Sequence, residues 1–276
     1  MILGAHESIA GGVSRAFGRA EEHGAQSLQI FTKSSRAWAS APLSSEERTA
    51  FRKESRRTGM PSIAHGSYLV NLASDQPLLR EKSITCVKEE LGRCEALGVR
   101  SLVIHPGAHA SASAGIRLIA EALDEVHAAT PRYGARISLE VTAGQGCSIG
   151  WRFEHLAEII ARVQNPKRLH VCLDTCHLFA AGYDISHYRG YEQVMQQLEA
   201  TLGTRRVDAV HLNDSKKGLG CRVDRHAELG QGALGLEPFR ELVNDSRFAE
   251  AVGVLETPQP ERYGEALRLL HSMKRG

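Results

Sequence analysis

The chain alternates short apolar runs with longer helix-like segments, and this alternation restricts its possible folds more than any other feature. Eight runs are rich in branched apolar side chains and are continuous rather than alternating, which is typical of strands covered on both faces. We expect these strands at residues 2–6, 27–31, 62–66, 101–106, 137–141, 169–174, 208–213 and 252–257.

Between these runs the sequence has helical periodicity, and several helical segments end at glycine, a common stop signal. The clearest segments are 45–59, 76–98, 113–130, 151–163, 191–203, 236–248 and 262–273. A strand followed by a helix, repeated eight times, predicts an α/β fold of the (β/α)8 TIM-barrel type. No Pro/Ser-rich linker divides the 276 residues, so we expect a single domain over residues 1–276.

The composition is ordinary for a globular protein, with 42% hydrophobic and 24% charged residues and a net charge of +2. Global charge therefore does not indicate a nucleic-acid partner, and any basic surface must be local. The six cysteines include no CxxC pair, which favours reduced thiols. The first residues do not resemble a signal peptide, and no apolar run reaches the roughly 18 to 20 residues of a membrane helix. We expect a cytoplasmic protein.

Histidine or carboxylate side chains stand at the ends of seven of the eight expected strands. They are His6, His65, His105, Glu140, Asp174, His211 and Glu256. In a barrel the carboxyl ends of the strands converge on one face, where active sites are built. These side chains should therefore meet in one place, although His6 is as well suited to a supporting role as to a ligand role.

Two close pairs add to this set: Asp174 with His177, and Asp224 with His226. With His6 set aside, five histidines and four carboxylates cannot cluster away from water without charge compensation, which divalent cations provide. The donor types suit Zn²⁺, with Mn²⁺ or Fe²⁺ as alternatives. Nine ligands are too many for one tetrahedral ion and are enough for two or three. The pattern predicts metal-assisted hydrolysis, most naturally of a phosphate ester.

Eight segments of the chain form a specific combination of motifs: GAHESIAGG (4–12), QIFTKSSRAW (29–38), AHGSYLVNLAS (64–74), HPGAH (105–109), LEVTAGQG (139–146), CLDTCHLFAAGYD (172–184), HLNDSKKGLGCRVDRH (211–226) and LETP (255–258). Through these segments the chain resembles the endonuclease IV family of apurinic/apyrimidinic DNA-repair endonucleases over essentially its whole length. The resemblance implies a TIM barrel that carries three zinc ions, with Mn²⁺ possible at one or more sites.

The resemblance also implies how nine residues divide among the ions. The first zinc would take His65, His105 and Glu140; the second Glu140 as a bridge, Asp174, His211 and Glu256; the third His177, Asp224 and His226. Glu140 and Glu256 would act in catalysis through the metals. Asp174 and His177 would then belong to two different ions, and we expect this role in place of a helix cap.

The implied activity is hydrolysis of the phosphodiester 5′ to an abasic site, which leaves a 3′-hydroxyl and a 5′-deoxyribose phosphate. A hydroxide between two of the zincs would be the nucleophile, and removal of blocking groups from 3′ ends would be a related activity. The partner would be double-stranded DNA that contains abasic sites or blocked 3′ ends, bound by a monomer.

The resemblance places the DNA contacts on loops at the top of the barrel. Arg36, Tyr68 and Leu69 match residues that enter the DNA at the lesion, and Arg225 adds a further contact. Local positive charge is expected from Lys33, Lys216, Lys217 and Arg222. His109 is suited either to a phosphate contact or to capping the helix that follows it.

Four positions depart from the family pattern without removing a ligand: Val141, Glu7, Ala37 and Gln231. They bring into question the support around Glu140 and the details of DNA contact. One alternative is a sugar isomerase or epimerase that uses Glu140, Asp174, His211 and Glu256, which leaves the other five ligands unexplained. A second is a non-catalytic protein that binds abasic DNA, which the complete ligand set disfavours.

Overall fold

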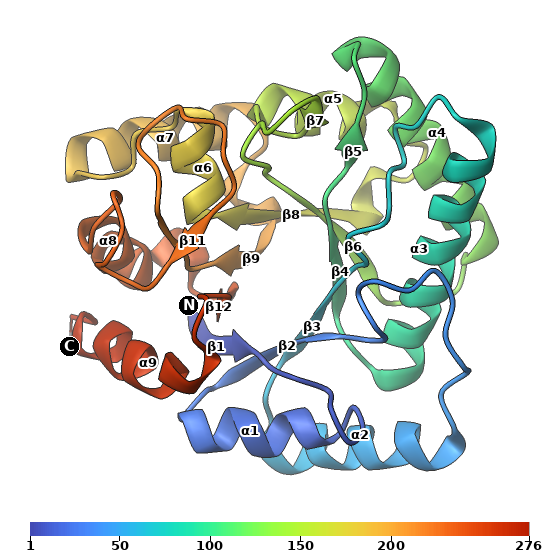
Figure 1. The fold of residues 1–276 in the computed structure, drawn as a ribbon, viewed down its shortest axis with the longest axis horizontal. Coiled ribbons are helices and arrows are strands. Elements are labelled where there is room, and N and C mark those ends of the chain that lie inside the picture. Colours follow the sequence, from blue (N-terminus) through green and yellow to red (C-terminus); the bar gives the residue numbers. More distant parts are fainter. Residues whose placement is uncertain (276) are drawn as a thin grey trace.

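Eight parallel strands form a closed barrel in the computed structural model, which describes residues 1–275 (Figure 1). They are β1 (Ile2–His6), β2 (Ser27–Phe31), β3 (Ser62–His65), β4 (Ser101–Ile104), β6 (Arg136–Glu140), β8 (Leu169–Asp174), β9 (Val207–His211) and β12 (Val252–Leu255). Their order around the barrel follows the chain, and β1 pairs with β12 to close it. The predicted TIM barrel is confirmed, and each expected strand lies within two residues of an observed one.

Helices surround the barrel on its outside (Figure 1). They are α1 (Arg15–His23), α2 (Ser45–Thr58), α3 (Pro77–Leu97), α4 (Ala112–Ala129), α5 (Phe153–Arg162), α6 (Thr175–Ala181), α7 (Tyr188–Thr201), α8 (Glu237–Asn244) and α9 (Tyr263–Ser272). Single 3-10 turns are η1 (Pro166–Arg168), η2 (Thr204–Arg206), η3 (Ser246–Phe248) and η4 (Pro260–Arg262). The periodicity had not indicated α1 or α6. Helix α6 has no exposed face, because Thr175 to Ala180 are all buried, so its sequence carries no alternation of apolar and polar residues.

Local sequence signals set the ends of the other helices. Ser44 and Glu47 form a capping box at the start of α2, which satisfies two backbone N–H groups. Gly59 and Gly98 end α2 and α3 in the left-handed conformation that glycine adopts without steric cost. The expected glycine stop signals therefore end the helices where the periodicity ends.

Two short antiparallel strand pairs, the second of them a hairpin, hold the loops beyond the strand ends. They pair β5 (Gly107–Ala108) with β7 (Ser148–Ile149), and β10 (Asp214–Ser215) with β11 (His226–Ala227). The β10–β11 hairpin turns the long loop after β9 back toward the barrel, so that the last residues of the loop lie against the barrel again. This loop is coloured orange in Figure 1. His226, near the end of that loop, is thereby brought to the face formed by the strand ends.

The described residues contain no disulfide, since all six cysteines are free. Among the helices of residues 1–275, none combines the length and the apolar character needed to cross a membrane.

Candidate metal centre

The predicted ligands lie at the carboxyl end of the barrel above a small apolar layer. That layer is a separate cluster of buried side chains: Ile63, Val103, Cys172, Ala209, Val252 and Val254. Five of these residues precede His65, His105, Asp174, His211 and Glu256 by two positions, and side chains two apart in a strand share a face. The ligands therefore point into the barrel, and the apolar layer forms the floor of the site.

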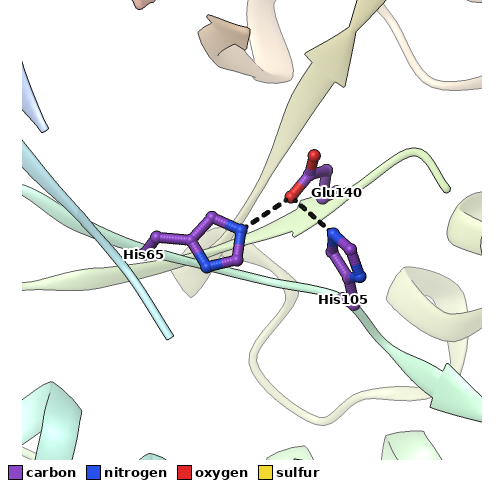
Figure 2. Close-up of side chains that lie close together, drawn as sticks. All are labelled: His65, His105 and Glu140. Carbon is purple, nitrogen blue, oxygen red and sulfur yellow. Dashed lines mark hydrogen bonds and ion pairs between the residues drawn. The ribbon is translucent and has the colours of Figure 1, made fainter. Parts of the chain in front are cut away.

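Glu140, at the end of β6, lies at the centre of the site and is 1% exposed. Its Oε2 is 3.2 Å from Nε2 of His65 and 3.1 Å from Nε2 of His105. Figure 2 draws both contacts as dashed lines. Its Oε1 is 3.1 Å from Nδ1 of His211. The two oxygens thus face different imidazoles, which is the arrangement that a bridging carboxylate requires. His65, His105 and Glu140 have ligand atoms close enough together to hold one ion.

A second group forms around His211, which is fully buried at the end of β9. Glu140, Asp174 and His211 have ligand atoms close enough together to bind a common ion. Nδ1 of His211 is also 3.2 Å from Oε2 of Glu256, and 3.8 Å from Oδ2 of Asp174. The three carboxylates predicted for the second ion therefore surround Nδ1 of His211, the fourth predicted ligand.

The third group joins the start of α6 to the long loop after β9. Nε2 of His177 is 3.2 Å from Oδ2 of Asp224, and Nε2 of His226 is 3.3 Å from Oδ1 of Asp224. Asp174 also approaches His226, and Cys176 can form a group with Asp224 and His226. Burial raises the pKa of the Cys176 thiol to about 12, which favours a neutral, packed side chain over a thiolate ligand.

Four of the five histidines present a fixed nitrogen to the site, because the other ring nitrogen contacts an oxygen outside it. Nδ1 of His65 is 2.8 Å from the Gly66 carbonyl, and Nδ1 of His177 is 2.9 Å from the Val141 carbonyl. Nδ1 of His226 lies 3.1 Å from the backbone carbonyl of Glu256. Nε2 of His211 is 2.9 Å from Oε1 of Gln29. Metal-binding histidines are typically oriented in this way.

The buried nitrogens that face the site have the properties of metal ligands. Nε2 of His177 and Nε2 of His226 are buried and make no well-aligned hydrogen bond among the described residues, although the Asp224 carboxylate lies 3.2 and 3.3 Å from them. Leaving such atoms unpaired is costly, and a divalent cation would satisfy them. The residues present therefore fit a cluster of divalent metal ions.

The electrostatics of the site follow from packing charges of both signs together. Burial alone would lower the pKa of His65, but the Glu140 carboxylate raises it to about 9. In the same way, Asp174 and Asp224 raise the pKa of His226 to about 9 against the effect of burial. Burial disfavours the charged form of Glu140, yet the imidazoles of His211 and His105 hold its pKa well below its usual range. Protons thus compensate carboxylate charge here, as metal ions would.

Asp174 corrects one sequence expectation, because it is a helix cap as well as a candidate ligand. Its Oδ1 accepts a hydrogen bond of 2.8 Å from the backbone N–H of His177 at the start of α6. Its Oδ2 accepts a hydrogen bond of 2.7 Å from Nδ2 of Asn213 and faces the site. A carboxylate has two oxygens, so the two roles do not compete.

Two buried amides at the site were missed by the sequence reasoning. Gln29, in β2, donates from Nε2 to Oε1 of Glu256 at 2.5 Å and also contacts His6. Asn213 accepts the backbone N–H of Glu256 at 3.0 Å. Gln29 lies in the one expected strand for which the sequence showed no histidine or carboxylate at the end, and its polar side chain within that apolar run was the available signal. Nδ1 of His6 is 3.2 Å from Glu256, which agrees with a supporting role.

The residues predicted to contact DNA lie on loops beside the metal centre. Arg36, Tyr68 and Arg225 are exposed, and Leu69 is half-buried. The Tyr68 ring lies 5.5 Å from the rings of Phe31 and His65, which connects its loop to the site. A cavity of about 290 Å³ opens here, lined by His65, His105, Tyr68, Leu69 and Asn71 among others.

The basic residues divide into exposed and buried ones. Lys216, Lys217 and Arg222 are exposed, as expected for phosphate contacts. Lys33 was expected with them, and this is wrong: its side chain is fully buried and donates to the carbonyls of Ala37 and Trp38.

His109 and the four departures from the family pattern also have visible neighbours. Nδ1 of His109 accepts the backbone N–H of Ser111 at 2.9 Å, whereas Ser111 itself caps α4. Glu7 is buried and pairs with Nδ1 of His23 at 2.7 Å. Val141 contributes its backbone carbonyl to His177, a contact that does not depend on its side chain. Ala37 likewise acts through its carbonyl, and Gln231 is exposed.

Comparisons with known proteins agree with this geometry. A family model described as "Xylose isomerase-like TIM barrel" matches residues 17–273. "Probable endonuclease 4" of Chloroflexus aurantiacus is 49% identical over 280 residues, which cover 99% of this chain and 98% of that protein. "Probable endonuclease 4" of Citrifermentans bemidjiense is 43% identical and covers 100% and 99%.

Solved structures also match this chain over nearly its whole length. Endonuclease IV from Thermus thermophilus matches with a TM-score of 0.89 and 38% identity, covering 99% of this chain and 98% of that one. A D-tagatose 3-epimerase-like protein matches with a TM-score of 0.77 at 20% identity, covers 99% and 97%, and shares the fold. The resemblance carried by the sequence motifs is thereby confirmed, and the chain belongs to the endonuclease IV family.

Proposed function

We propose that this protein is a metal-dependent DNA-repair endonuclease that hydrolyses the phosphodiester 5′ to an abasic site. The products would be a 3′-hydroxyl and a 5′-deoxyribose phosphate, and removal of blocking groups from 3′ ends would be a related activity. The observation that carries the proposal is the set of nine histidine and carboxylate side chains that meet at one end of the barrel, in a chain of the endonuclease IV family.

The nine side chains would hold three zinc ions, with Mn²⁺ as an alternative at one or more of them. His65, His105 and Glu140 would bind the first, and Glu140, Asp174, His211 and Glu256 the second. His177, Asp224 and His226 would bind the third. When bound, the ions would supply a hydroxide nucleophile and stabilise the charge on the phosphate oxygens.

The rest of the reaction depends on how the chain's own residues orient the site and the substrate. Backbone carbonyls and Gln29 fix the imidazole rings, so the ligands are preorganised before substrate binds. Arg36, Tyr68 and Leu69 would enter the duplex at the lesion. The cavity beside His105 could then accept the displaced sugar. Arg225, with Lys216, Lys217 and Arg222, would contact phosphates.

The sugar isomerase alternative has weaker support. Epimerases share the barrel with this chain at 20% identity or less, which speaks for the fold alone. That reading also gives no role to the paired side chains of Asp224 and His226. A single domain over residues 1–276, a monomeric state and a cytoplasmic location remain predictions.

The deciding experiment uses a 5′-labelled duplex that carries one tetrahydrofuran abasic analogue. Native protein, chelator-stripped protein and stripped protein with Zn²⁺ restored would be compared. Metal-dependent incision that leaves an extendable 3′-hydroxyl immediately 5′ to the analogue supports the proposal, because a β-lyase cannot act on this analogue. Intact DNA after incubation with protein shown to hold three metals would overturn it.

A further inference from the structure

The two loops that carry the proposed DNA-inserting residues touch each other directly. The hydroxyl of Ser67 donates to the carbonyl of Ser35 at 2.8 Å, and the backbone N–H of Tyr68 donates to the same carbonyl at 3.2 Å. Ser35 immediately precedes Arg36, and Ser67 immediately precedes Tyr68 and Leu69. One carbonyl therefore fixes the spacing between the two groups of inserting side chains.

Glu90 of helix α3 supports the Tyr68 loop from below. Both of its carboxylate oxygens accept the backbone N–H of Ser67, at 3.1 and 3.2 Å. Glu90 is 1% exposed and Ser67 is 6% exposed, so water does not compete for these bonds. A Cβ at Gly66 would lie 2.9 Å from the Ile104 side chain, which shows how closely this loop is packed against β4.

Lys33 supports the Arg36 loop from the same side. Its ammonium group donates to the carbonyls of Ala37 at 3.2 Å and Trp38 at 2.6 Å, directly after Arg36. It also lies 3.3 Å from the Cys86 sulfur, which in turn is 3.7 Å from Oε2 of Glu90. Burial raises the pKa of the Cys86 thiol to about 11, so the protonated thiol can donate to Glu90.

These contacts come from one face of α3, at the spacing of helix neighbours. Ser83 accepts the backbone N–H of Asn71 at 3.0 Å, and Arg93 donates to the carbonyl of Thr32 at 2.9 Å. Cys86 and Glu90 lie between them in the sequence. A buried helix face would ordinarily be apolar, whereas Ser83, Cys86 and Glu90 are all buried polar or sulfur-containing side chains. Each of them is used by a loop contact, directly or through Lys33.

We propose that this face of α3, together with Lys33 and Ser67, is a clamp that holds the Arg36 and Tyr68 loops at a fixed separation, so that Glu90, Lys33 and Ser67 are positioning residues for recognition of an abasic site. The inference rests on the proposed function. It adds that discrimination between damaged and intact DNA depends on a buried hydrogen-bond network that does not touch DNA. Preorganised loops lose less conformational freedom on binding, which lowers KM without altering the chemical step.

The experiment compares the full-length, zinc-loaded protein with Glu90→Ala and Glu90→Gln. Glu90→Ala should raise KM for the abasic duplex and lower the preference for abasic over intact duplex by roughly tenfold each, with kcat little changed. Glu90→Gln keeps an oxygen that can accept the N–H of Ser67. Its KM and its preference for abasic duplex should therefore be close to those of the wild-type protein. Zinc content and hydrolysis of bis(p-nitrophenyl) phosphate should stay at the wild-type level, because this small diester needs no loop contact.

A matched control is available on the same helix. Oε2 of Glu95 accepts the backbone N–H groups of Gly134 at 2.8 Å and Ala135 at 3.0 Å, away from both loops. Glu95→Ala should lower stability without changing the preference for abasic DNA. In a Tyr68→Ala background, Glu90→Ala should cost little further if it acts through the loop.

The outcomes separate this inference from the proposed function. If wild-type protein incises the abasic duplex but Glu90→Ala keeps its KM and preference, the clamp is wrong and the function stands. Equal losses in Glu90→Ala and Glu95→Ala would also overturn the clamp. Should Glu90→Ala fail to fold, Ser67→Ala decides, since it removes the hydroxyl that joins the Ser35 carbonyl to the Leu69 N–H and leaves the backbone bond to Glu90 in place. Failure of wild-type protein to incise would count against the function itself.

Discussion

At the level of single residues, Gln29 determines how two candidate ligands are oriented. It accepts from His211 and donates to Glu256, so its amide fixes which atom each of them turns toward the metal site. We predict that Gln29→Leu weakens zinc retention about 10- to 100-fold, as loss of an outer contact to a ligand typically does. Zinc content would be measured during titration with a competing chelator.

The control for this prediction lies three residues earlier. Gln26→Leu changes the same residue type at an exposed position just before β2 and should leave zinc retention unchanged. Equal zinc affinity in wild-type and Gln29→Leu proteins would contradict the role given to this amide.

His127 provides a prediction about pH that does not involve the metal site. It lies in α4 with both ring nitrogens unpartnered among the described residues. Burial, assisted by the neighbouring Arg168 guanidinium and opposed by Asp124, lowers the pKa of His127 from 6.5 to about 4. Below pH 6.5 the unfolded chain therefore binds a proton that the folded protein does not accept until about pH 4.

The folded state should accordingly lose about 2 kcal/mol through this group as the pH falls from 6.5 to 4. His127→Leu removes the ionisable group. The free energy of unfolding of this variant should therefore fall by about 2 kcal/mol less than that of the wild-type protein between pH 6.5 and 4. Urea denaturation of chelator-treated wild-type and variant proteins at several pH values would measure the difference. Parallel curves for the two proteins would rule out the assigned pKa shift.

At the level of secondary-structure elements, Asp174 connects the start of α6 with the metal centre. Because one oxygen caps the helix and the other faces the site, the two functions can be separated by substitution. Asp174→Ala removes both, whereas Asp174→Ser keeps a cap. In metal-free protein we expect the serine variant to be more stable by about 1 kcal/mol, with zinc binding impaired in both. Chemical denaturation and metal analysis would test this.

Ser111 offers a comparison without a ligand role, since its hydroxyl caps α4. Ser111→Ala should lose a similar free energy of unfolding and retain its zinc. If Asp174→Ser and Asp174→Ala have the same stability, the cap makes no net contribution.

The elements also show which parts of the structure could be predicted from sequence. The barrel strands are continuous apolar runs, so their positions and their polar last residues were readable, and the convergence of those residues follows from the fold. Helix α6 and the β10–β11 hairpin are too short or too uniformly buried to leave a pattern.

Roles that depend on tertiary contacts were less accessible. Lys33 reads as surface charge in sequence, because only packing against Cys86 and two loop carbonyls reveals its burial. Gln29 carries no charge and matches no ligand type, so its contacts to His211 and Glu256 required the structure.

At the level of the whole molecule, six adjacent strands of the barrel carry ligands at or just beyond their ends. These are β12, β9, β8, β6, β4 and β3, and the remaining two, β1 and β2, supply His6 and Gln29 as outer contacts. Bound metal ions would therefore connect most of the barrel circumference. Ligands that bind the folded state alone stabilise it by mass action.

We therefore expect chelator-treated protein to melt about 5 to 10 °C below the zinc-loaded protein, with recovery when Zn²⁺ is restored. Differential scanning calorimetry would measure the shift. Glu140→Gln removes the negative charge of the proposed bridging side chain. This variant should therefore lose most of the rise in melting temperature that zinc produces. A melting temperature independent of zinc in wild-type protein would show that the ions do not couple these strands.

The closure of the barrel between β1 and β12 has a consequence for biosynthesis. His6 and Gln29 are among the first site residues to leave the ribosome, while Glu256, which both of them contact, follows the last strand of the barrel. A growing chain can therefore form neither the complete barrel nor the complete ligand set until that strand has been synthesised. Nuclease activity is thereby withheld from unfinished chains by the topology of the fold.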